Sequence, residues 1–168
     1  MLATAVRAAI PIAPFTLMDQ DGRAFRSDKA LAGQVTLVFF GYTHCPDVCP
    51  TTLLKLQQLL DSDAAFADVR VLMISVDGER DTPAAMKRFL VPIAPRFVGL
   101  TGEPDALASV ERTFSAAFAR QPAATPGGEY TVDHSAQVYL VDRSGRLSEL
   151  FFNAPVEGMR DALRVALR

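Results

Sequence analysis

The stretch VTLVFFGYTHCPDVCPTTL, residues 35–53, joins a buried strand to a helix through a loop that carries both cysteines of the chain. Residues 35–40 are a continuous apolar run rich in β-branched and aromatic side chains, which is typical of a central strand covered on both faces. Gly41 ends this run, and Pro50 suits the first turn of a helix, where a missing N–H costs little. Leucines at helical spacing predict that the helix continues over residues 51–60 and packs on the sheet.

Strands and helices alternate along the rest of the chain. The predicted elements are a hairpin at 15–25, strands at 69–76 and 97–100, helices at 84–90 and 103–118, a loop at 121–129, a hairpin of 135–141 with 147–152, and a helix at 156–167. This order predicts an α/β fold: a thioredoxin-like, three-layer plan with a mixed central sheet, an N-terminal hairpin extension and an inserted loop. The cysteines then lie at the carboxyl end of a central strand, where open sheets place their sites.

Length and composition describe a globular protein. The chain has 168 residues, of which 49% are apolar, so it can build a core and is not disordered. A formal net charge of −2, with Lys and Arg scattered, argues against nucleic-acid binding. We expect one thioredoxin-like domain over residues 1–168, in which residues 1–14 are the remnant of a removed leader or of an anchor linker.

The two cysteines are placed for thiol chemistry. Cys45 precedes the predicted helix and Cys49 lies close to its start, where the positive end of the helix dipole favours a thiolate. Their spacing is CxxxC, not the CxxC of dithiol oxidoreductases, and positions i and i+4 share one face of a helical turn. Both thiolates can therefore reach one ion, and a disulfide is also possible if the loop adjusts.

A metal site needs at least one further ligand, and His134 is the candidate. Thiolates favour Cu(I) or Zn(II), and a Cys2His set suits either trigonal Cu(I) or a catalytic zinc with an open position. A closed zinc site would want His44 as well, although joint ligation with its neighbour Cys45 is awkward. The alternative for His134 is a histidine that only forms hydrogen bonds at the mouth of a strand.

The segment DGERD, residues 77–81, follows the second predicted strand and belongs at the same edge of the sheet. Two interpretations stay open for it. It is either a solvated turn that caps the next helix, or a segment that orients the cysteine site or docks a partner.

Four segments of this chain resemble the Sco/SenC family of copper-binding thioredoxin-like proteins. They are FFGYTHCPDVCPTTL (39–53), SVDGERDTP (75–83), FVGLTG (97–102) and VDHSAQVYLVD (132–142). The resemblance spans about residues 15–152, and its most specific part is the CPDVCP loop followed much later by the DHS histidine. It implies that the copper ligands are Cys45, Cys49 and His134, with copper bound as Cu(I) or as Cu(II).

The resemblance also implies a function. The expected protein is a metallochaperone that supplies Cu(I) to the CuA site of cytochrome c oxidase subunit II, with a periplasmic copper donor protein as a second partner. The alternative is a thiol-disulfide oxidoreductase that reduces the CuA cysteines through Cys45 and Cys49, and a weaker one is a peroxide-reducing or redox-sensing protein. Whether the protein is an enzyme stays open, with the chaperone favoured. Family members stand on the periplasmic side of the bacterial inner membrane by an anchor, so this chain is expected to be a soluble fragment.

The chain departs from the family pattern at two places. Gly78 stands where many relatives have proline, which predicts a looser turn and puts partner contacts there in doubt. The 121–129 loop also matches poorly. Neither departure touches a ligand.

Overall fold

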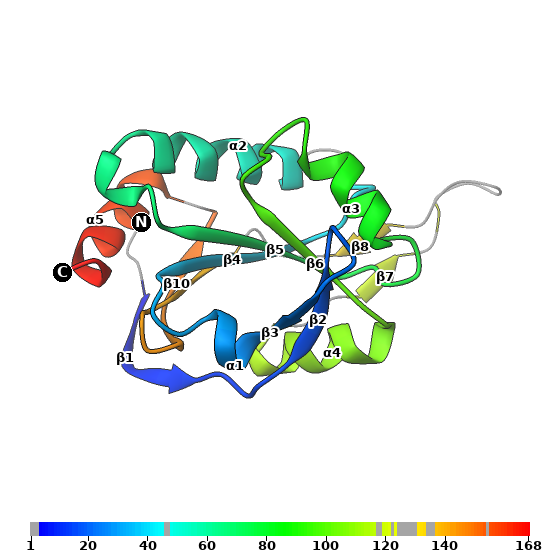
Figure 1. The fold of residues 1–168 in the computed structure, drawn as a ribbon, viewed down its shortest axis with the longest axis horizontal. Coiled ribbons are helices and arrows are strands. Elements are labelled where there is room, and N and C mark those ends of the chain that lie inside the picture. Colours follow the sequence, from blue (N-terminus) through cyan, green and yellow to red (C-terminus); the bar gives the residue numbers. More distant parts are fainter. Residues whose placement is uncertain are drawn as a thin grey trace.

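The computed structural model describes residues 4–45, 48–116, 119–121, 123, 131–133, 137–153 and 155–168. Within these residues the chain forms an eight-stranded mixed sheet with helices on both faces, and a separate two-stranded ribbon (Figure 1). The sheet strands, in spatial order, are β1 (Thr4–Pro11), β10 (Arg146–Phe152), β9 (Gln137–Val141), β4 (Thr36–Gly41), β5 (Arg70–Ser75), β6 (Val98–Thr101), β2 (Thr16–Asp19) and β3 (Ala24–Arg26). The ribbon pairs β7 (Ala119–Gln121) with β8 (Thr131–Asp133).

The helices form the outer layers. In Figure 1, α2, α3 and α5 lie on one side of the sheet, and α1 and α4 lie on the other. Their bounds are α1 (Ser27–Ala30), α2 (Val48–Asp61), α3 (Pro83–Leu90), α4 (Pro104–Thr113) and α5 (Val156–Ala166), with a short 3-10 helix at Ala64–Phe66. This is the three-layer arrangement that the alternation of strands and helices predicts.

The centre of the sheet is parallel and fully covered. β4 runs parallel to β5, with Phe39 opposite Met73, and β5 runs parallel to β6. On its other side β4 pairs antiparallel with β9, where Val138 lies opposite Phe39. All six residues of β4 are buried, which explains why the strand is apolar from Leu37 to Phe40 and does not alternate between apolar and polar residues.

Successive residues of β4 build two separate cores. Leu37 and Phe39 pack in the cluster beneath α2, α3 and α5, whereas Val38 and Phe40 pack in the cluster that α4 covers. This alternation follows from the two-residue period of a strand. The central strand is therefore held from both faces, and its carboxyl end provides a fixed base for the cysteine loop.

The α/β fold with a mixed sheet is confirmed, and so is the N-terminal hairpin. β2 pairs with β3 so that Leu17 lies opposite Phe25, and Gly22 supplies the turn at a φ of 77°. Most of the predicted 121–129 loop and the first two residues of the predicted strand 135–141 lie outside the described residues.

The sequence did not predict the short elements α1, β7, β8 and the 3-10 helix, and three further differences concern longer elements. α2 begins at Val48 rather than at residue 51, so that Cys49 lies inside its first turn. α4 ends at Thr113 rather than at residue 118, just before Ser115, whose φ of 55° is outside the helical region. Residues 4–11 form β1, an antiparallel partner of β10 that the sequence did not predict. The origin of residues 1–14 in a leader or an anchor linker stays a prediction, as does the single-domain organisation.

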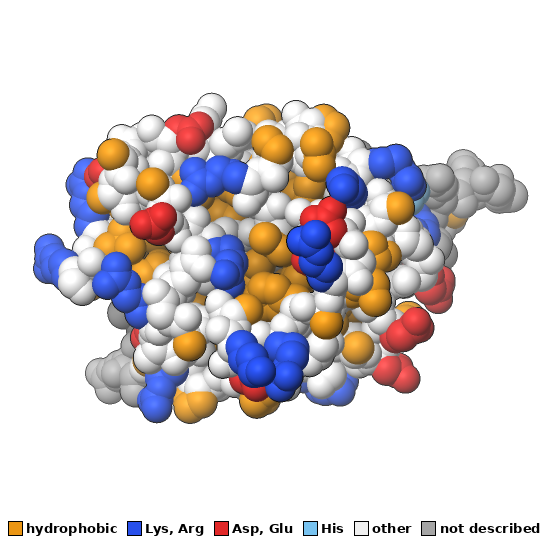
Figure 2. All heavy atoms as spheres, viewed as in Figure 1, with side chains coloured by type: hydrophobic (Ala, Val, Ile, Leu, Met, Phe, Trp, Pro, Cys, Tyr) orange, Lys and Arg blue, Asp and Glu red, His pale blue; other side chains and the backbone are white. Residues whose placement is uncertain are grey.

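The surface shows a mixture of side-chain types. On the face in Figure 2, Lys and Arg side chains are interspersed with acidic, polar and apolar ones and form no continuous basic patch. Of the helices in the described part of the chain, none is both long and apolar enough to cross a bilayer.

Candidate metal-binding dithiol site

Cys45 and Cys49 lie close together, Cys45 in the segment that connects the end of β4 to α2 and Cys49 in the first turn of α2. Cys45 is 6% exposed and Cys49 is 1% exposed, and no disulfide joins them. With Tyr42 they form a small buried cluster, against which Val76 and Phe89 pack. The structure thus places the two thiols side by side in an apolar setting, at the carboxyl end of the central strand, as the sequence predicts.

Gly41, the last residue of β4, makes room for one of the sulfurs. A Cβ atom built on Gly41 would lie 2.7 Å from Sγ of Cys49 and 3.2 Å from Cε of Met73. The first distance is too short for a real Cβ atom and the second is tight, so the thiol of Cys49 rests directly on the backbone of the strand. From the sequence, Gly41 is predicted only to end the strand. Its contact with the Cys49 sulfur could not be predicted, because it depends on how α2 packs against β4.

The surroundings hold Cys49 in its protonated form. The pKa of the Cys49 thiol is raised, first by a hydrogen bond with the Cys45 side chain, then by burial and by the charge of Cys45. A hydrogen bond from the backbone of Tyr42 acts in the opposite direction, but it is the weaker effect. The start of a helix alone would favour the thiolate. Here burial and the second thiol outweigh it, so a cation must displace protons to bind both sulfurs.

The turn that leads to Cys45 is tied to Asp81, at the start of α3. The hydroxyl of Thr43 donates to Oδ1 of Asp81 at 2.6 Å, and the Thr43 backbone N–H donates to Oδ2 at 3.2 Å. The hydroxyl of Ser75, the last residue of β5, donates to Oδ2 at 2.7 Å. Burial raises the pKa of Asp81, and the hydrogen bonds from Thr43 and Ser75 oppose that effect.

A second acidic residue anchors the same turn. The carboxylate of Asp77, which is 3% exposed, forms an ion pair with Nε of Arg80. The Arg80 guanidinium carbon lies 5.8 Å from the centre of the Tyr42 ring, within cation–π range. The DGERD segment therefore contacts the cysteine turn, which supports the interpretation that it orients the site.

Gly78 makes this segment compact rather than loose. A Cβ atom at Gly78 would lie 2.6 Å from the carbonyl oxygen of Gly102 and 3.1 Å from the nitrogen of Pro104. The turn after β5 is thus packed against the turn after β6. The looser turn that the sequence predicts at this position is not what the structure shows.

His44 is exposed and lies next to the two carboxylates. The ligand atoms of His44, Asp77 and Asp81 all lie within 4.8 Å of one another. Nδ1 of His44 is 3.2 Å from the hydroxyl of Thr43. Because protein donors already bind the carboxylates of Asp77 and Asp81, the three residues form a hydrogen-bonded cluster that supports the turn, and not an open cation site.

His134 lies outside the described residues. β8 ends at Asp133 and β9 begins at Gln137, on the two sides of it in the sequence. Since β9 is antiparallel to β4, its first residues lie beside the carboxyl end of β4, where the cysteine loop begins. The described residues do not test its predicted part in the ligand set.

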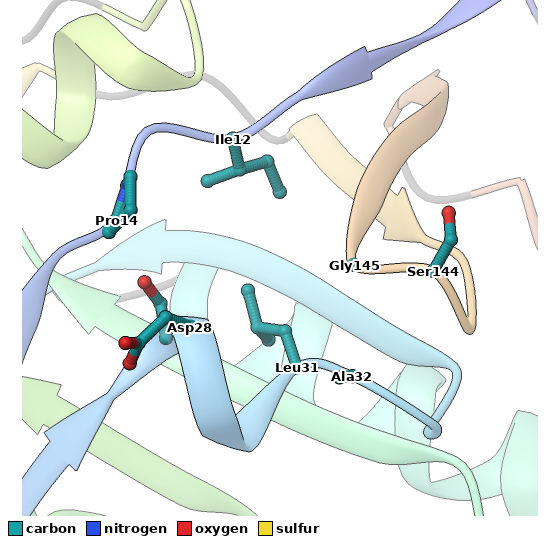
Figure 3. A pocket seen from close by; sticks show the side chains of 8 residues that line it. Ile12, Pro14, Asp28, Leu31, Ala32, Ser144 and Gly145 are labelled. Carbon is teal, nitrogen blue, oxygen red and sulfur yellow. The ribbon is translucent and has the colours of Figure 1, made fainter.

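A separate pocket of about 170 Å³ lies at the opposite end of β4. In Figure 3, Ile12 and Leu31 extend into it from two segments, and Ser144 and Gly145 close one side. Its lining contains neither thiol nor imidazole, so it has no part in the dithiol chemistry.

The family model for SCO1/SenC matches residues 4–164, and the chain belongs to this family. A SCO2-like protein of Rickettsia conorii is 36% identical over 152 residues, which cover 89% of this chain and 74% of the relative. ScoI of Bradyrhizobium japonicum, solved with copper bound, superposes with a TM-score of 0.80 at 40% identity, covering 93% of this chain and 99% of that one.

A third relative bears on the thiols. BsSco, described as a member of the Sco family of cytochrome c oxidase assembly proteins, superposes with a TM-score of 0.75 at 26% identity, covering 95% of this chain and 94% of that one. A disulfide switch has been identified in BsSco. Among the relatives of this chain, one is therefore solved with copper bound, and another is described as having a disulfide switch.

Proposed function

We propose that this protein is a copper metallochaperone for cytochrome c oxidase assembly. It holds Cu(I) with the thiolates of Cys45 and Cys49 and the imidazole of His134, and supplies it to the CuA site of subunit II. The observation that carries the proposal is the pair of buried, mutually hydrogen-bonded thiols at the end of β4, in a chain 40% identical to a copper-bound ScoI.

The site chemistry suits a soft monovalent ion. Two thiolates in an apolar setting repel each other and are costly to bury, and a bound cation offsets both effects. Cu(I) prefers thiolate sulfur, and it accepts three ligands. A three-ligand site leaves one side open, so an incoming cysteine or histidine of a partner can enter before the old ligands leave. That property distinguishes a carrier from a closed structural site.

Copper loading is coupled to protons. Because the pKa of Cys49 is raised, the reduced protein without copper carries a proton on the Cys49 thiol at neutral pH. Binding of Cu(I) displaces that proton, and its return favours release. The same residues also bind Cu(II) as an alternative cargo, with a fourth ligand from solvent or from the protein.

A second candidate function is reduction of the CuA cysteines. Cys45 and Cys49 are close enough to share a hydrogen bond, and BsSco, a relative, has a disulfide switch. In this reaction one thiolate attacks a disulfide of subunit II, and the other resolves the mixed disulfide. The pair loses two electrons and two protons and becomes a disulfide, while the CuA cysteines gain them and become thiols. Oxidation would also remove the copper ligands.

The family resemblance supports a place on the periplasmic side of the bacterial inner membrane, with a membrane anchor and a periplasmic copper donor. We propose that residues 1–168 act there as a single copper-carrying domain. Its first partner supplies Cu(I), and its second, subunit II, accepts it.

A Cu(I) competition titration against a chelator, under reducing and anaerobic conditions, tests the leading proposal. The wild type should bind one Cu(I), and Cys45→Ser, Cys49→Ser and His134→Ala should each lose affinity by orders of magnitude. Binding that survives both cysteine substitutions would refute the proposed site. If only His134→Ala binds as the wild type does while both cysteines are required, the reductase becomes the better interpretation.

A further inference from the structure

We propose that Asp81 is a positioning residue for copper binding: its buried carboxylate fastens the turn that carries Cys45 to the end of β5. The proposal rests on the proposed copper-binding function and assigns a role to the DGERD segment. Asp81 does not contact the cargo in this account. It acts through Thr43, two residues before Cys45.

The carboxylate of Asp81 joins segments that are distant in sequence. Thr43 reaches it with both its hydroxyl, at 2.6 Å, and its backbone N–H, at 3.2 Å. Ser75 reaches the second carboxylate oxygen at 2.7 Å. Hydrogen bonds to a carboxylate are stronger than those between neutral groups, and a two-point attachment fixes the orientation of Thr43 as well as its distance.

Asp81 is itself held rigidly. It is 1% exposed, and its backbone carbonyl accepts a hydrogen bond from the hydroxyl of Thr101 in β6. Its backbone N–H donates to the carbonyl of Asp77 at 2.9 Å. An attachment point that is fixed to β5, to β6 and to the start of α3 cannot follow the cysteine turn if that turn moves.

The neighbouring residue provides a second contact to the same turn. Arg80, paired with Asp77, lies over the ring of Tyr42, and Tyr42 packs against both cysteines. The Cys45 backbone N–H donates to the carbonyl of Tyr42 at 3.2 Å, which closes the turn. The DGERD segment thus contacts Tyr42 and Thr43, the two residues that follow Gly41.

This arrangement has a consequence for metal affinity. Cys49 is fixed by helix α2 and by its seat on Gly41, but Cys45 precedes the helix and depends on its turn for position. If the turn is already ordered before copper binds, the binding free energy is not reduced by the entropy lost in ordering the turn. Loss of the Asp81 contact should therefore weaken Cu(I) binding beyond any effect on folding.

The sharpest variant is Thr43→Val, which removes the hydroxyl that bonds Asp81 and keeps the β-branched shape. Thr82→Val is the matched control. Thr82 is adjacent to Asp81, but its hydroxyl accepts from the Ala85 N–H at 3.1 Å and so caps α3 instead of the cysteine turn. Thr43→Ser restores a hydroxyl and should rescue binding. All three are compared with wild type by Cu(I) competition and by thermal unfolding of the apo protein.

We expect Thr43→Val to weaken Cu(I) binding about tenfold, the effect of one hydrogen bond to a charged group. Thr82→Val should lower the melting temperature by about 2–4 °C, as loss of a helix cap does, and leave copper affinity unchanged. Thr43→Ser should bind within about twofold of wild type, on the scale of small hydrogen-bond adjustments.

Two results would overturn the positioning role. One is Thr43→Val with wild-type affinity, while Cys45→Ser and Cys49→Ser abolish binding; the copper function would then stand without the hydroxyl bond from Thr43 to Asp81, the shorter of the two contacts on which the positioning role rests. The other is an equal loss of affinity in Thr43→Val and Thr82→Val, which would mean general destabilisation. If wild type shows no cysteine-dependent Cu(I) binding, the proposed function fails and the positioning role fails with it.

Discussion

A Cβ atom on Gly41 would come within 2.7 Å of Sγ of Cys49, so the absence of a side chain on the strand decides where the sulfur rests. The thiol lies on the backbone at the carboxyl end of β4, and the strand is buried on both faces. The position of this sulfur is therefore set by the backbone of a strand that is buried on both faces, whereas the position of Cys45 is set by a turn and its hydrogen bonds.

Gly41→Ala should displace the Cys49 sulfur and weaken Cu(I) binding by about fivefold to a hundredfold, since overpacking a buried site costs about 1–3 kcal/mol. Gly158→Ala in α5 is the control, because its Cβ would lie at an ordinary 3.7 Å from Cγ of Pro155. That change should raise stability by about 0.4–1 kcal/mol and leave copper affinity alone. Wild-type affinity in Gly41→Ala would show that the sulfur has another way to reach the metal.

If His134 serves the metal and not the core, His134→Ala should lower Cu(I) affinity by orders of magnitude and change the free energy of unfolding of the apo protein by no more than about 0.5 kcal/mol. The physical reason is the loss of one of three ligands. Chelator competition and melting curves give both quantities. A large loss of apo stability in His134→Ala would show a structural residue instead of a ligand.

Alkylation of the reduced apo protein should be slow at neutral pH and faster at alkaline pH. The cause is the raised pKa of Cys49, which keeps that thiol protonated until the pH rises well above the ordinary pKa of a cysteine. Cu(I) should protect both thiols, because ligation and alkylation need the same thiolate. Mass spectrometry of labelled protein, with and without Cu(I), measures this. Equal labelling rates in the two samples would contradict a shared site.

Gly78→Pro should lower the melting temperature of this chain. A Cβ at residue 78 meets the carbonyl oxygen of Gly102 at 2.6 Å and Cδ1 of Leu107 at 3.1 Å, so the turns after β5 and β6 must separate. Thermal unfolding of the apo protein tests the expectation. A melting temperature at or above the wild-type value would show that the two turns adjust without strain.

The central part of the fold could be predicted because its signals are local. Residues 35–40 are apolar except for Thr36, Pro50 fits a first helical turn, and both features lie next to the cysteines in the sequence. β1 was missed because residues 4–11 show no clear strand pattern, and their conformation depends on pairing with β10, far away in the chain.

In the site, too, the residues with a local sequence signal could be predicted, whereas the contacts between distant segments could not. The sequence identifies Cys45 and Cys49 through their spacing, and the structure brings them together. It could not identify the contacts of Asp81, because Thr43, Ser75 and Thr101 meet only when β4, β5 and β6 align. It also overestimated α4, since the apolar spacing continues to residue 118 while the helix ends at Thr113.

Copper K-edge X-ray absorption of the Cu(I)-loaded protein tests the central claim most directly. The account predicts two sulfur ligands at about 2.3 Å and one nitrogen at about 2.0 Å, distances typical of thiolate and imidazole ligands to a small metal ion. The nitrogen shell should disappear in His134→Ala, and one sulfur should disappear in Cys45→Ser and in Cys49→Ser. A first shell without sulfur, or a nitrogen shell that is unchanged in His134→Ala, would contradict the proposed Cys45, Cys49 and His134 site.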